Sequence, residues 1–374
     1  MSNRRIVSVS AQIYDLPLPV PIKLGHFEVR SREYVAVQIE TDSGHVGTSW
    51  ALSRGAPIDK FVERYASDLL IGQDPTAISL LWMKIYRSMT PVVRDGSGMR
   101  ALSLVDIALW DIKGQVAGIP IWALLGGYRS ETDVLMVAGY LRNGEDPAQV
   151  ADEVVRFSNK GHRLVKIACA ASDNDTRLML AESVSRGLNG ETSLVVDAAW
   201  RWDSARSARN AAKEWHSTAP IAWLEDPFPV SRREQFELLH RSVSGLNVGA
   251  GDEASDRDNL MTLVESGYLD VLRLDLTTVG GFTGALPLIL AAQNLGVTVS
   301  PHLYPETSIH IAMSFPSVDH VETFDRSIPE GNPLDPIHLY VDSELPPTGS
   351  TFLAPRRAGL SSHLDLDALS RYRI

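Results

Sequence analysis

Three short apolar segments of the sequence each end in an acid. The acids are Asp197, Glu225 and Asp252, with Glu253 beside the last of them. Successive acids are separated by 28 and 27 residues, which is about one strand–helix–strand unit. If the segments are consecutive parallel strands of a barrel, the side chains meet at one rim. Carboxylates held together repel one another unless a cation binds them, and oxygen ligands with room for water suit Mg²⁺. The spacing therefore predicts a magnesium site.

Other β-rich segments also end in polar residues. They are Lys166, Asp275, His302 and Glu322. On adjacent strands, Asp275 would hydrogen-bond one imidazole nitrogen of His302 and leave the other nitrogen to act as a base. Glu322, at the next strand end, could donate or accept a proton opposite this histidine. A single histidine or acid in such a place is more often structural, for example a helix cap, so the prediction of a catalytic site rests on their occurrence together.

The positions of these strand ends imply the fold. From Val134 onwards, short β-rich segments alternate with helical patterns. The expected strands are Val134–Tyr140, Leu164–Ala168, Ser193–Asp197, Ile221–Glu225, Asn247–Gly251, Asp270–Asp275, Val297–His302 and His320–Phe324. Alternation predicts a parallel sheet, and eight units predict an α/β fold with a (β/α)8 barrel of the TIM type. A doubly wound open sheet is less favoured, because no glycine-rich dinucleotide turn follows an early strand.

The first ~125 residues have a different, α+β pattern. Expected strands are Val7–Leu18, Glu33–Glu40 and His45–Trp50, and expected helices are Ile58–Leu70, Ala77–Ser88 and Met99–Val116. The segment Pro17–Glu28, with Lys23 and His26, is expected to be a proline-rich loop, either a lid or a surface connection. We expect an N-terminal α+β domain at residues 1–127 and the barrel at residues 128–326. A C-terminal tail at residues 327–374 is expected to pack on the first domain.

Composition restricts the class of protein. The chain has 374 residues and a formal net charge of −11, without a basic stripe, which argues against nucleic-acid binding. It has a single cysteine, Cys169, so no internal disulfide can form. The N-terminus lacks the apolar segment of a signal peptide, and no apolar segment approaches membrane-spanning length. We expect a soluble cytoplasmic protein whose partner is a small molecule, and Mg²⁺ with a lysine can still make a cleft attractive to an anion.

Together these segments resemble the enolase superfamily, mandelate racemase subgroup, over roughly residues 5–345. The motifs that carry the resemblance are Leu194-Val-Val-Asp197, Trp223-Leu-Glu-Asp-Pro227, Gly251-Asp252, Asp275 before Gly280-Gly281, Ser300-Pro-His302 and Val321-Glu322. The helix Ser103–Lys113 and the segment Leu124-Leu-Gly-Gly127 are similar to the end of that family's capping domain. Aspartate at 275, where the muconate-lactonizing branch has lysine, is typical of racemases and sugar-acid dehydratases.

The resemblance implies a role for each residue. Asp197, Glu225 and Asp252 would bind Mg²⁺, with Glu253 as the alternative third ligand. His302 and Asp275 would form the base dyad, Lys166 would contact the substrate carboxylate, and Glu322, kept protonated by a neighbouring carboxylate, would donate a hydrogen bond to it. The substrate would be a small hydroxy acid or sugar acid, and the family's usual assembly is a homo-oligomer.

Two departures from the family pattern affect the expected reaction. The second lysine of strand two is Ala168 here, and the asparagine two residues after the first metal ligand is Ala199. Inversion at carbon normally needs bases on both faces, so Ala168 favours a lyase that eliminates water from a hydroxy acid or sugar acid and yields a 2-keto acid. The alternatives are a racemase or epimerase whose second base is Tyr140, Lys23 or His26, and a metal-binding barrel without catalysis. Specificity is expected in Pro19–Arg30, in Trp50–Pro57 and at Tyr140.

Overall fold

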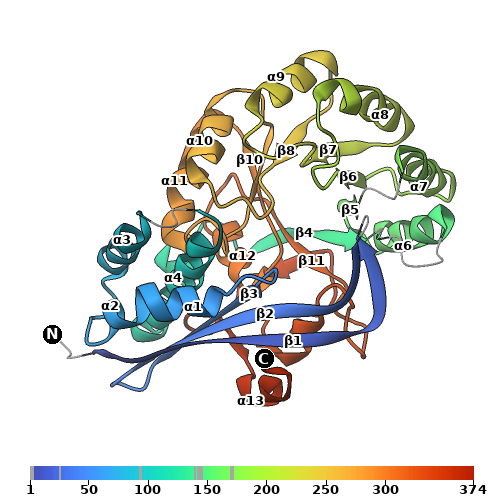
Figure 1. Cartoon of the computed structure of the whole chain (residues 1–374). Coiled ribbons are helices and arrows are strands. Elements are labelled where there is room, and N and C mark those ends of the chain that lie inside the picture. The colour runs from blue at the N-terminus through green and yellow to red at the C-terminus, as the bar shows by residue number, and fades with distance from the viewer. Residues whose placement is uncertain (1–3, 25–26, 92–94, 139, 141–145, 169–171) are drawn as a thin grey trace.

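The computed structural model describes residues 4–24, 27–91, 95–138, 140, 146–168 and 172–374. An N-terminal sheet with its helices lies against a ring of strands that is surrounded by further helices (Figure 1). Within the described residues, no helix is long and apolar enough to cross a membrane.

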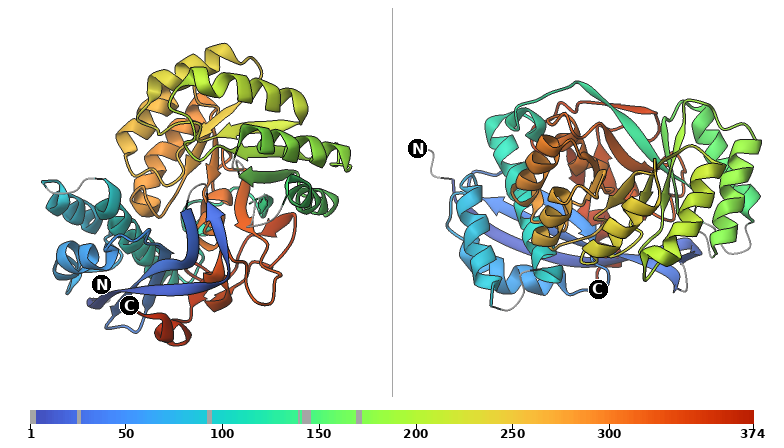
Figure 2. Two further views of the ribbon diagram at one scale, coloured as in Figure 1. Left: turned by 45° about the vertical axis from the view of Figure 1, so that its right-hand side comes forward. Right: turned by 90° about the horizontal axis from the view of Figure 1, so that it is seen from above.

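The N-terminal sheet is antiparallel, with the strand order β1-β2-β3. Its strands are β1 (Ile6–Leu24), β2 (Phe27–Thr41) and β3 (Val46–Leu52). The proline-rich loop expected at 17–28 is wrong, because after an irregularity the β1–β2 ladder resumes at Ile22 opposite Val29. Prolines are tolerated here because β1 is an edge strand, where a missing N–H breaks no inner ladder. The resulting hairpin arm bends toward the barrel (Figures 1 and 2).

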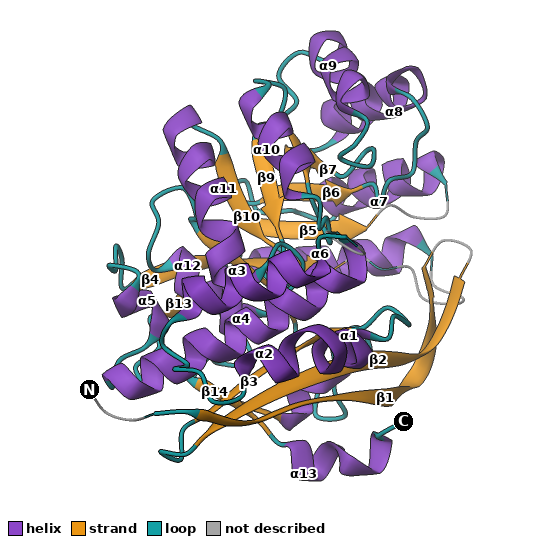
Figure 3. Cartoon of the chain, turned by 60° about the vertical axis from the view of Figure 1, so that its left-hand side comes forward, coloured by secondary structure: helices purple, strands orange, loops and turns teal. Residues whose placement is uncertain are grey.

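The helices of this part cover one face of the sheet. They are α1 (Ile58–Val62), the π-helical turn η1 (Glu63–Ser67), α2 (Asp68–Leu70), α3 (Ile78–Met89), α4 (Gly96–Ala117) and α5 (Ile121–Leu124). Helix α4 crosses the molecule between the sheet and the barrel (Figure 3) and contacts both β3 and α11. A Cβ at Gly281, the first residue of α11, would lie 2.3 Å from Asp106 of α4. Glycine is needed here because the two helices approach closely.

The barrel has eight parallel strands, as the sequence predicted. They are β4 (Glu131–Ala138), β5 (Leu164–Ala168), β6 (Ser193–Asp197), β7 (Ile221–Glu225), β8 (Val248–Ala250), β9 (Val271–Leu274), β10 (Thr298–Pro301) and β11 (His320–Phe324). Ladders join neighbours from β4 to β10, β11 pairs with β4, and β10 contacts β11 to complete the ring. The predicted (β/α)8 fold is therefore confirmed, although strand ends differ from the expected ones by up to three residues.

A helix follows each strand except β11. These helices are α6 (Pro147–Asn159), α7 (Asp173–Ser185), α8 (Ala205–Thr218), α9 (Arg233–Ser242), α10 (Arg257–Glu265), α11 (Gly281–Leu295) and α12 (Pro305–Ala312). Several starts are fixed by side-chain caps: Ser204 accepts from the Ser207 amide and Asp256 from the Asn259 amide. These caps end the loops that follow β6 and β8, next to the strand ends that carry the candidate site.

The C-terminal segment contacts both other parts. It contains η2 (Pro336–Tyr340), β12 (Val341–Ser343), β13 (Thr351–Leu353), β14 (Ser362–Leu364), α13 (Leu366–Leu369) and η3 (Ser370–Tyr372). Strand β13 extends the barrel sheet beside β4, while Leu364 and Leu369 pack with Tyr14 and Trp50 of the N-terminal sheet. The domain boundaries at 127 and 326 remain predictions.

Candidate active site

Three acids from neighbouring strand ends form a buried cluster. Asp197 ends β6, Glu225 ends β7, and Asp252 follows β8 by two residues. One carboxylate oxygen from each lies within 4.8 Å of the others, and the three residues are at most 8% exposed. Three carboxylates this close together repel one another unless cations lie among them. Oxygen donors at this spacing suit a hard divalent cation such as Mg²⁺.

The backbone around Asp252 is held by a residue that sequence reasoning did not assign. Asp226 accepts hydrogen bonds from the amides of Gly251 (2.9 Å) and Asp252 (3.1 Å). Gly251 has φ +127°, and a Cβ there would lie 2.2 Å from the carbonyl oxygen of Arg273, so no other residue fits this turn. Asp226 thus fixes the direction in which Asp252 points. Its sequence signal was its place between a strand-end acid and Pro227.

The choice between Asp252 and Glu253 follows from where their side chains go. Glu253 pairs with Arg54 and with Arg100 (2.8 Å), both from the N-terminal part. Asp252 faces Asp197 and Glu225 instead. Glu253 therefore joins the barrel to the N-terminal part, and its carboxylate is not a member of the acid cluster.

Lys166 of β5 extends into the acid cluster. Its Nζ lies 2.5 Å from Glu225, 3.2 Å from Asp197 and 3.4 Å from Asp252. A fourth carboxylate, Glu322, lies 3.0 Å away. Burial alone would lower the pKa of Lys166, but these four acids raise it well above its ordinary value. These contacts therefore favour the charged form of Lys166.

A second buried cation, Arg273 of β9, was not predicted. Its Nε lies 2.8 Å from Asp252 and 3.0 Å from Glu225, and its other end pairs with Glu322. The side chain is fully buried. Arg273 stands two positions before Asp275, so both side chains point to the same face of the chain. A charged residue two positions before a strand-end acid is expected to point into the barrel, and this spacing was the sequence signal for Arg273.

His302 and Asp275 form the expected pair. The imidazole Nδ1 lies 3.0 Å from Asp275 Oδ2, and since a carboxylate only accepts, Nδ1 is the donor. Asp275 is itself fixed by the amide of Thr277 at 2.7 Å. Nε2 points toward the acid cluster, 3.8 Å from Asp252. Burial would lower the pKa of His302, but the charges of Asp252 and Asp275 raise it to about 9.

The described neighbours of Glu322 do not favour its expected protonated form, which stays a prediction. Burial would raise the pKa of Glu322, but Arg273 and Lys166 together lower it to about 2. The carboxylate also accepts a hydrogen bond from the amide of Leu303 (3.2 Å), which likewise favours the ionised form. Acidic neighbours alone would favour the protonated form, and Arg273, the cation that pairs with Glu322, opposes it.

Four further positions were expected to bear on a second base or on the substrate: Tyr140, Lys23, His26 and Ala168. Tyr140 lies just beyond β4, and burial raises its pKa to about 12, with Lys166, Asp197 and Arg32 also acting on it. Lys23 lies in β1, but its side chain is outside the described residues, as is the whole of His26. Ala168 pairs with Asp197 across the β5–β6 ladder and offers no base there.

The space near Ala199 is shaped by packing. Its amide donates to Asp197 at 2.8 Å, which orients that acid. Trp202 packs against Trp215 with ring centroids 5.4 Å apart, and Trp200 is 44% exposed. Trp202 therefore has a structural contact.

Comparison with known proteins identifies the family. A model described as "Mandelate racemase / muconate lactonizing enzyme, N-terminal domain" matches residues 8–126, and one described as "Enolase C-terminal domain-like" matches residues 149–368. The chain belongs to the mandelate racemase/muconate lactonizing enzyme family. The predicted membership of the enolase superfamily is thereby confirmed.

Individual relatives of this family member differ in activity. The 3,6-anhydro-alpha-L-galactonate cycloisomerase of Streptomyces coelicolor is 24% identical, with 99% of each chain covered. The L-talarate/galactarate dehydratase of Salmonella typhimurium is 26% identical over 86% of this chain and 82% of its own. A racemase from Streptomyces coelicolor, solved with bound magnesium, has a TM-score of 0.87 at 24% identity, covering 99% of this chain and 100% of its own. The family is one of enzymes, and these relatives include both isomerases and a lyase.

Proposed function

We propose that this chain is a Mg²⁺-dependent enzyme that removes the proton alpha to the carboxylate of a hydroxy acid or sugar acid. Loss of the beta-hydroxyl then gives an enol that tautomerises to a 2-keto acid. The observation that carries the proposal is the hydrogen-bonded His302–Asp275 pair, which faces the cluster of Asp197, Glu225 and Asp252. A base that faces a cation site is the arrangement that proton abstraction beside a carboxylate requires.

Each side chain of the site has a separate role in removing the alpha proton. Asp197, Glu225 and Asp252 would hold Mg²⁺, which would polarise the substrate carboxylate and offset the charge of Asp252 that raises the pKa of His302. His302 Nε2 accepts the alpha proton, and Asp275 stabilises the resulting imidazolium through Nδ1. Lys166 contributes a fixed positive charge against the enediolate.

The elimination step uses the same imidazole. The proton on His302 Nε2 passes to the departing beta-hydroxyl, which leaves as water, and the imidazole returns to its neutral form. Ionised Glu322 does not donate in this scheme, and it positions Lys166 and Arg273, with which it pairs. Removing the alpha proton and protonating the leaving group from one side requires no base at Ala168.

A racemase or epimerase would need a second base on the opposite face of the substrate. Ala168 provides none, and the raised pKa of Tyr140, about 12, makes its phenolate costly to form. The elimination reaction therefore requires no base beyond His302. Racemisation requires a second base, which neither Ala168 nor Tyr140 supplies.

The test is His302→Asn, assayed with Mg²⁺ in D₂O on a panel of sugar acids. We expect loss of 2-keto acid formation and of alpha-proton exchange by NMR, while Mg²⁺ still raises the midpoint of thermal unfolding. His240→Asn, on α9, is the control histidine substitution and should leave both activities unchanged. Turnover retained by His302→Asn would refute the base assignment. Deuterium recovered in both stereoisomers of the substrate, without keto acid, would replace the lyase with an epimerase.

A further inference from the structure

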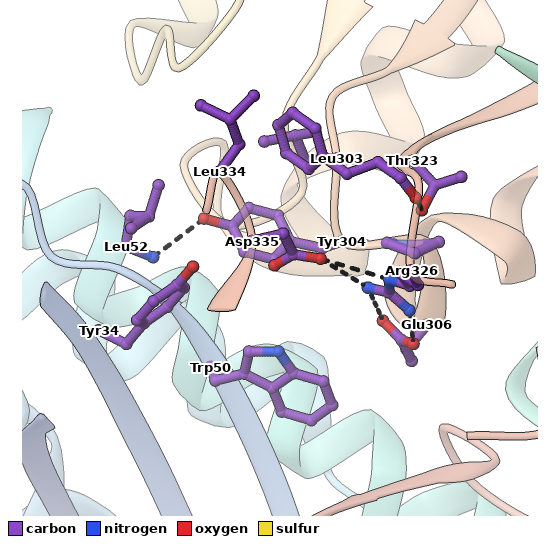
Figure 4. Close-up of a pocket in the computed structure, with 12 residues that line it drawn as sticks. Tyr34, Trp50, Leu52, Leu303, Tyr304, Glu306, Thr323, Arg326, Leu334 and Asp335 are labelled. Atoms are coloured by element: carbon purple, nitrogen blue, oxygen red, sulfur yellow. Dashed lines mark hydrogen bonds and ion pairs between the residues drawn. The ribbon is translucent and has the colours of Figure 1, made fainter. Parts of the chain in front are cut away.

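Arg32 of β2 is a buried cation that has no partner among the described residues. Only 7% of the residue is exposed, and its Nε is buried without a hydrogen bond. Across the part of the chain that the structure describes, no hydrogen bond or ion pair joins Arg32 to another residue. An uncompensated buried charge is costly. By contrast, Arg326, also largely buried, is paired with both Glu306 and Asp335 (Figure 4).

The register of the N-terminal sheet shows which way Arg32 faces. Leu16 and Arg32 are directly opposite, as are Tyr14 and Tyr34 two residues along, so these four side chains share one face of the sheet. Tyr34 on this face lines the small cavity between the sheet and the loop after β10 (Figure 4). The face therefore points toward the barrel.

The same face reaches the strands of the barrel itself. Leu18, two residues beyond Leu16 on β1, belongs to the same buried hydrophobic cluster as Leu135 and Val137 of β4, and Tyr140 packs against that cluster. The hairpin arm that carries Arg32 thus covers the rim of the barrel near the end of β4.

The electrostatic surroundings of Tyr140 connect Arg32 to the acid cluster. Burial raises the pKa of this phenol, Lys166 and Arg32 lower it, and Asp197 and Glu322 raise it further. The Tyr140 hydroxyl therefore lies within electrostatic range of both Arg32 and the proposed reaction centre. A substrate whose reacting carboxylate lies at Lys166 would extend toward Arg32 from there.

We propose that Arg32 binds the second carboxylate of a dicarboxylic sugar acid, so that the substrate class is aldaric acids rather than aldonic acids. This inference rests on the proposed function, because it places the first carboxylate at Lys166 and the acid cluster. A planar guanidinium offers two parallel donors that match a carboxylate, and one positive charge matches one negative charge. A monocarboxylic acid would leave Arg32 buried and unpaired, which disfavours its binding.

The experiment compares six-carbon aldaric acids, such as galactarate, with the corresponding aldonic acids, such as galactonate, in the presence of Mg²⁺. For the wild-type chain we expect kcat/KM to be higher for a diacid. Arg32→Met should reduce kcat/KM for the diacid about 100-fold, the loss expected for two charge-assisted hydrogen bonds, and change that for monoacids less than about threefold. Arg32→Lys keeps the positive charge but loses the two parallel guanidinium donors. Its kcat/KM for the diacid should therefore lie between those of Arg32→Met and the wild type. Arg64→Met, an exposed arginine on η1, is the control.

Binding gives a readout that does not depend on turnover. Diacids should raise the midpoint of thermal unfolding of the Mg²⁺-loaded wild-type chain more than monoacids do, and Arg32→Met should abolish that difference. If diacids bind preferentially but no acid exchanges its alpha proton, the proposed function fails and the Arg32 site stands. If acids turn over without preference, or Arg32→Met retains the preference, the Arg32 site is overturned.

A stability measurement separates binding from a structural role. Without ligand, Arg32→Met should be at least as stable as the wild type, because it removes a buried charge that has no partner. A lower thermal midpoint than that of Arg64→Met, together with equal losses for both classes of acid, would assign Arg32 a structural role instead.

Discussion

Replacing Arg273 by glutamine tests whether the acid cluster is a cation site. The guanidinium is fully buried and pairs with Asp252, Glu225 and Glu322 at once. Removing one partner from a buried ion pair costs about 3–5 kcal/mol, because charge is left uncompensated. For a chain of this length we expect that loss to lower the midpoint of thermal unfolding by about 5 °C.

Mg²⁺ should restore much of this stability. Two of the three acids that lose the guanidinium, Glu225 and Asp252, belong to the acid cluster, and a bound divalent cation would neutralise them. We therefore expect Arg273→Gln to lose about 5 °C relative to wild type in EDTA and less than half of that at saturating Mg²⁺. The assay is thermal unfolding followed by fluorescence over a magnesium titration, with calorimetry to measure the affinity directly.

The chain offers a matched control in Arg326. It is also largely buried and pairs with two acids, Glu306 and Asp335, the latter at 3.2 Å, where all three line the small cavity (Figure 4). Arg326→Gln should cost a similar amount in EDTA, and Mg²⁺ should not reduce the loss. Equal losses for Arg273→Gln with and without Mg²⁺ would show that the acids it pairs with do not bind the ion, and the reasoning would be refuted.

Two further predictions concern the third acid and a buried histidine. Asp252→Asn should weaken Mg²⁺ binding about 10- to 100-fold by calorimetry, and Glu253→Gln less than about threefold, because only Asp252 faces the cluster; the reverse order would make Glu253 the ligand. His310 accepts from the Trp122 amide at 3.2 Å, and burial lowers its pKa to about 4. Its contribution to stability is complete above its unfolded pKa of about 6.5 and is lost as pH falls toward 4, by about 3 kcal/mol. His310→Asn should therefore lose less unfolding free energy than wild type between pH 7 and pH 4 in denaturant titrations, and parallel losses would contradict the assignment.

Much of the fold could be read from local patterns. Strands β5, β6, β7 and β11 have the bounds that the apolar segments predicted. Periodicity and turn residues act over a few residues and therefore leave a signal in the sequence itself. The prediction of a loop at 17–28 is wrong because it assumed that prolines interrupt strands. Prolines are acceptable in β1 because this strand lies at the edge of the sheet.

Part of the candidate site could also be predicted from the sequence. Asp197, Glu225, Asp252, Asp275 and His302 could be named from the sequence because each follows a strand, and a barrel brings the ends of its strands to one rim. Their types and spacing determined the kind of chemistry. Nothing beyond the order of strands was needed to bring these residues together.

Only the tertiary structure decided which charges oppose one another. Arg273 contacts Asp252 and Glu322 from 21 and 49 residues away in the chain, and its contact with Glu322 lowers the pKa of that carboxyl group. The absence of any partner for Arg32 among the described residues is likewise visible only once the sheet is folded against the barrel. Ionisation and pairing depend on distances across the fold, and a sequence pattern carries no information about those distances.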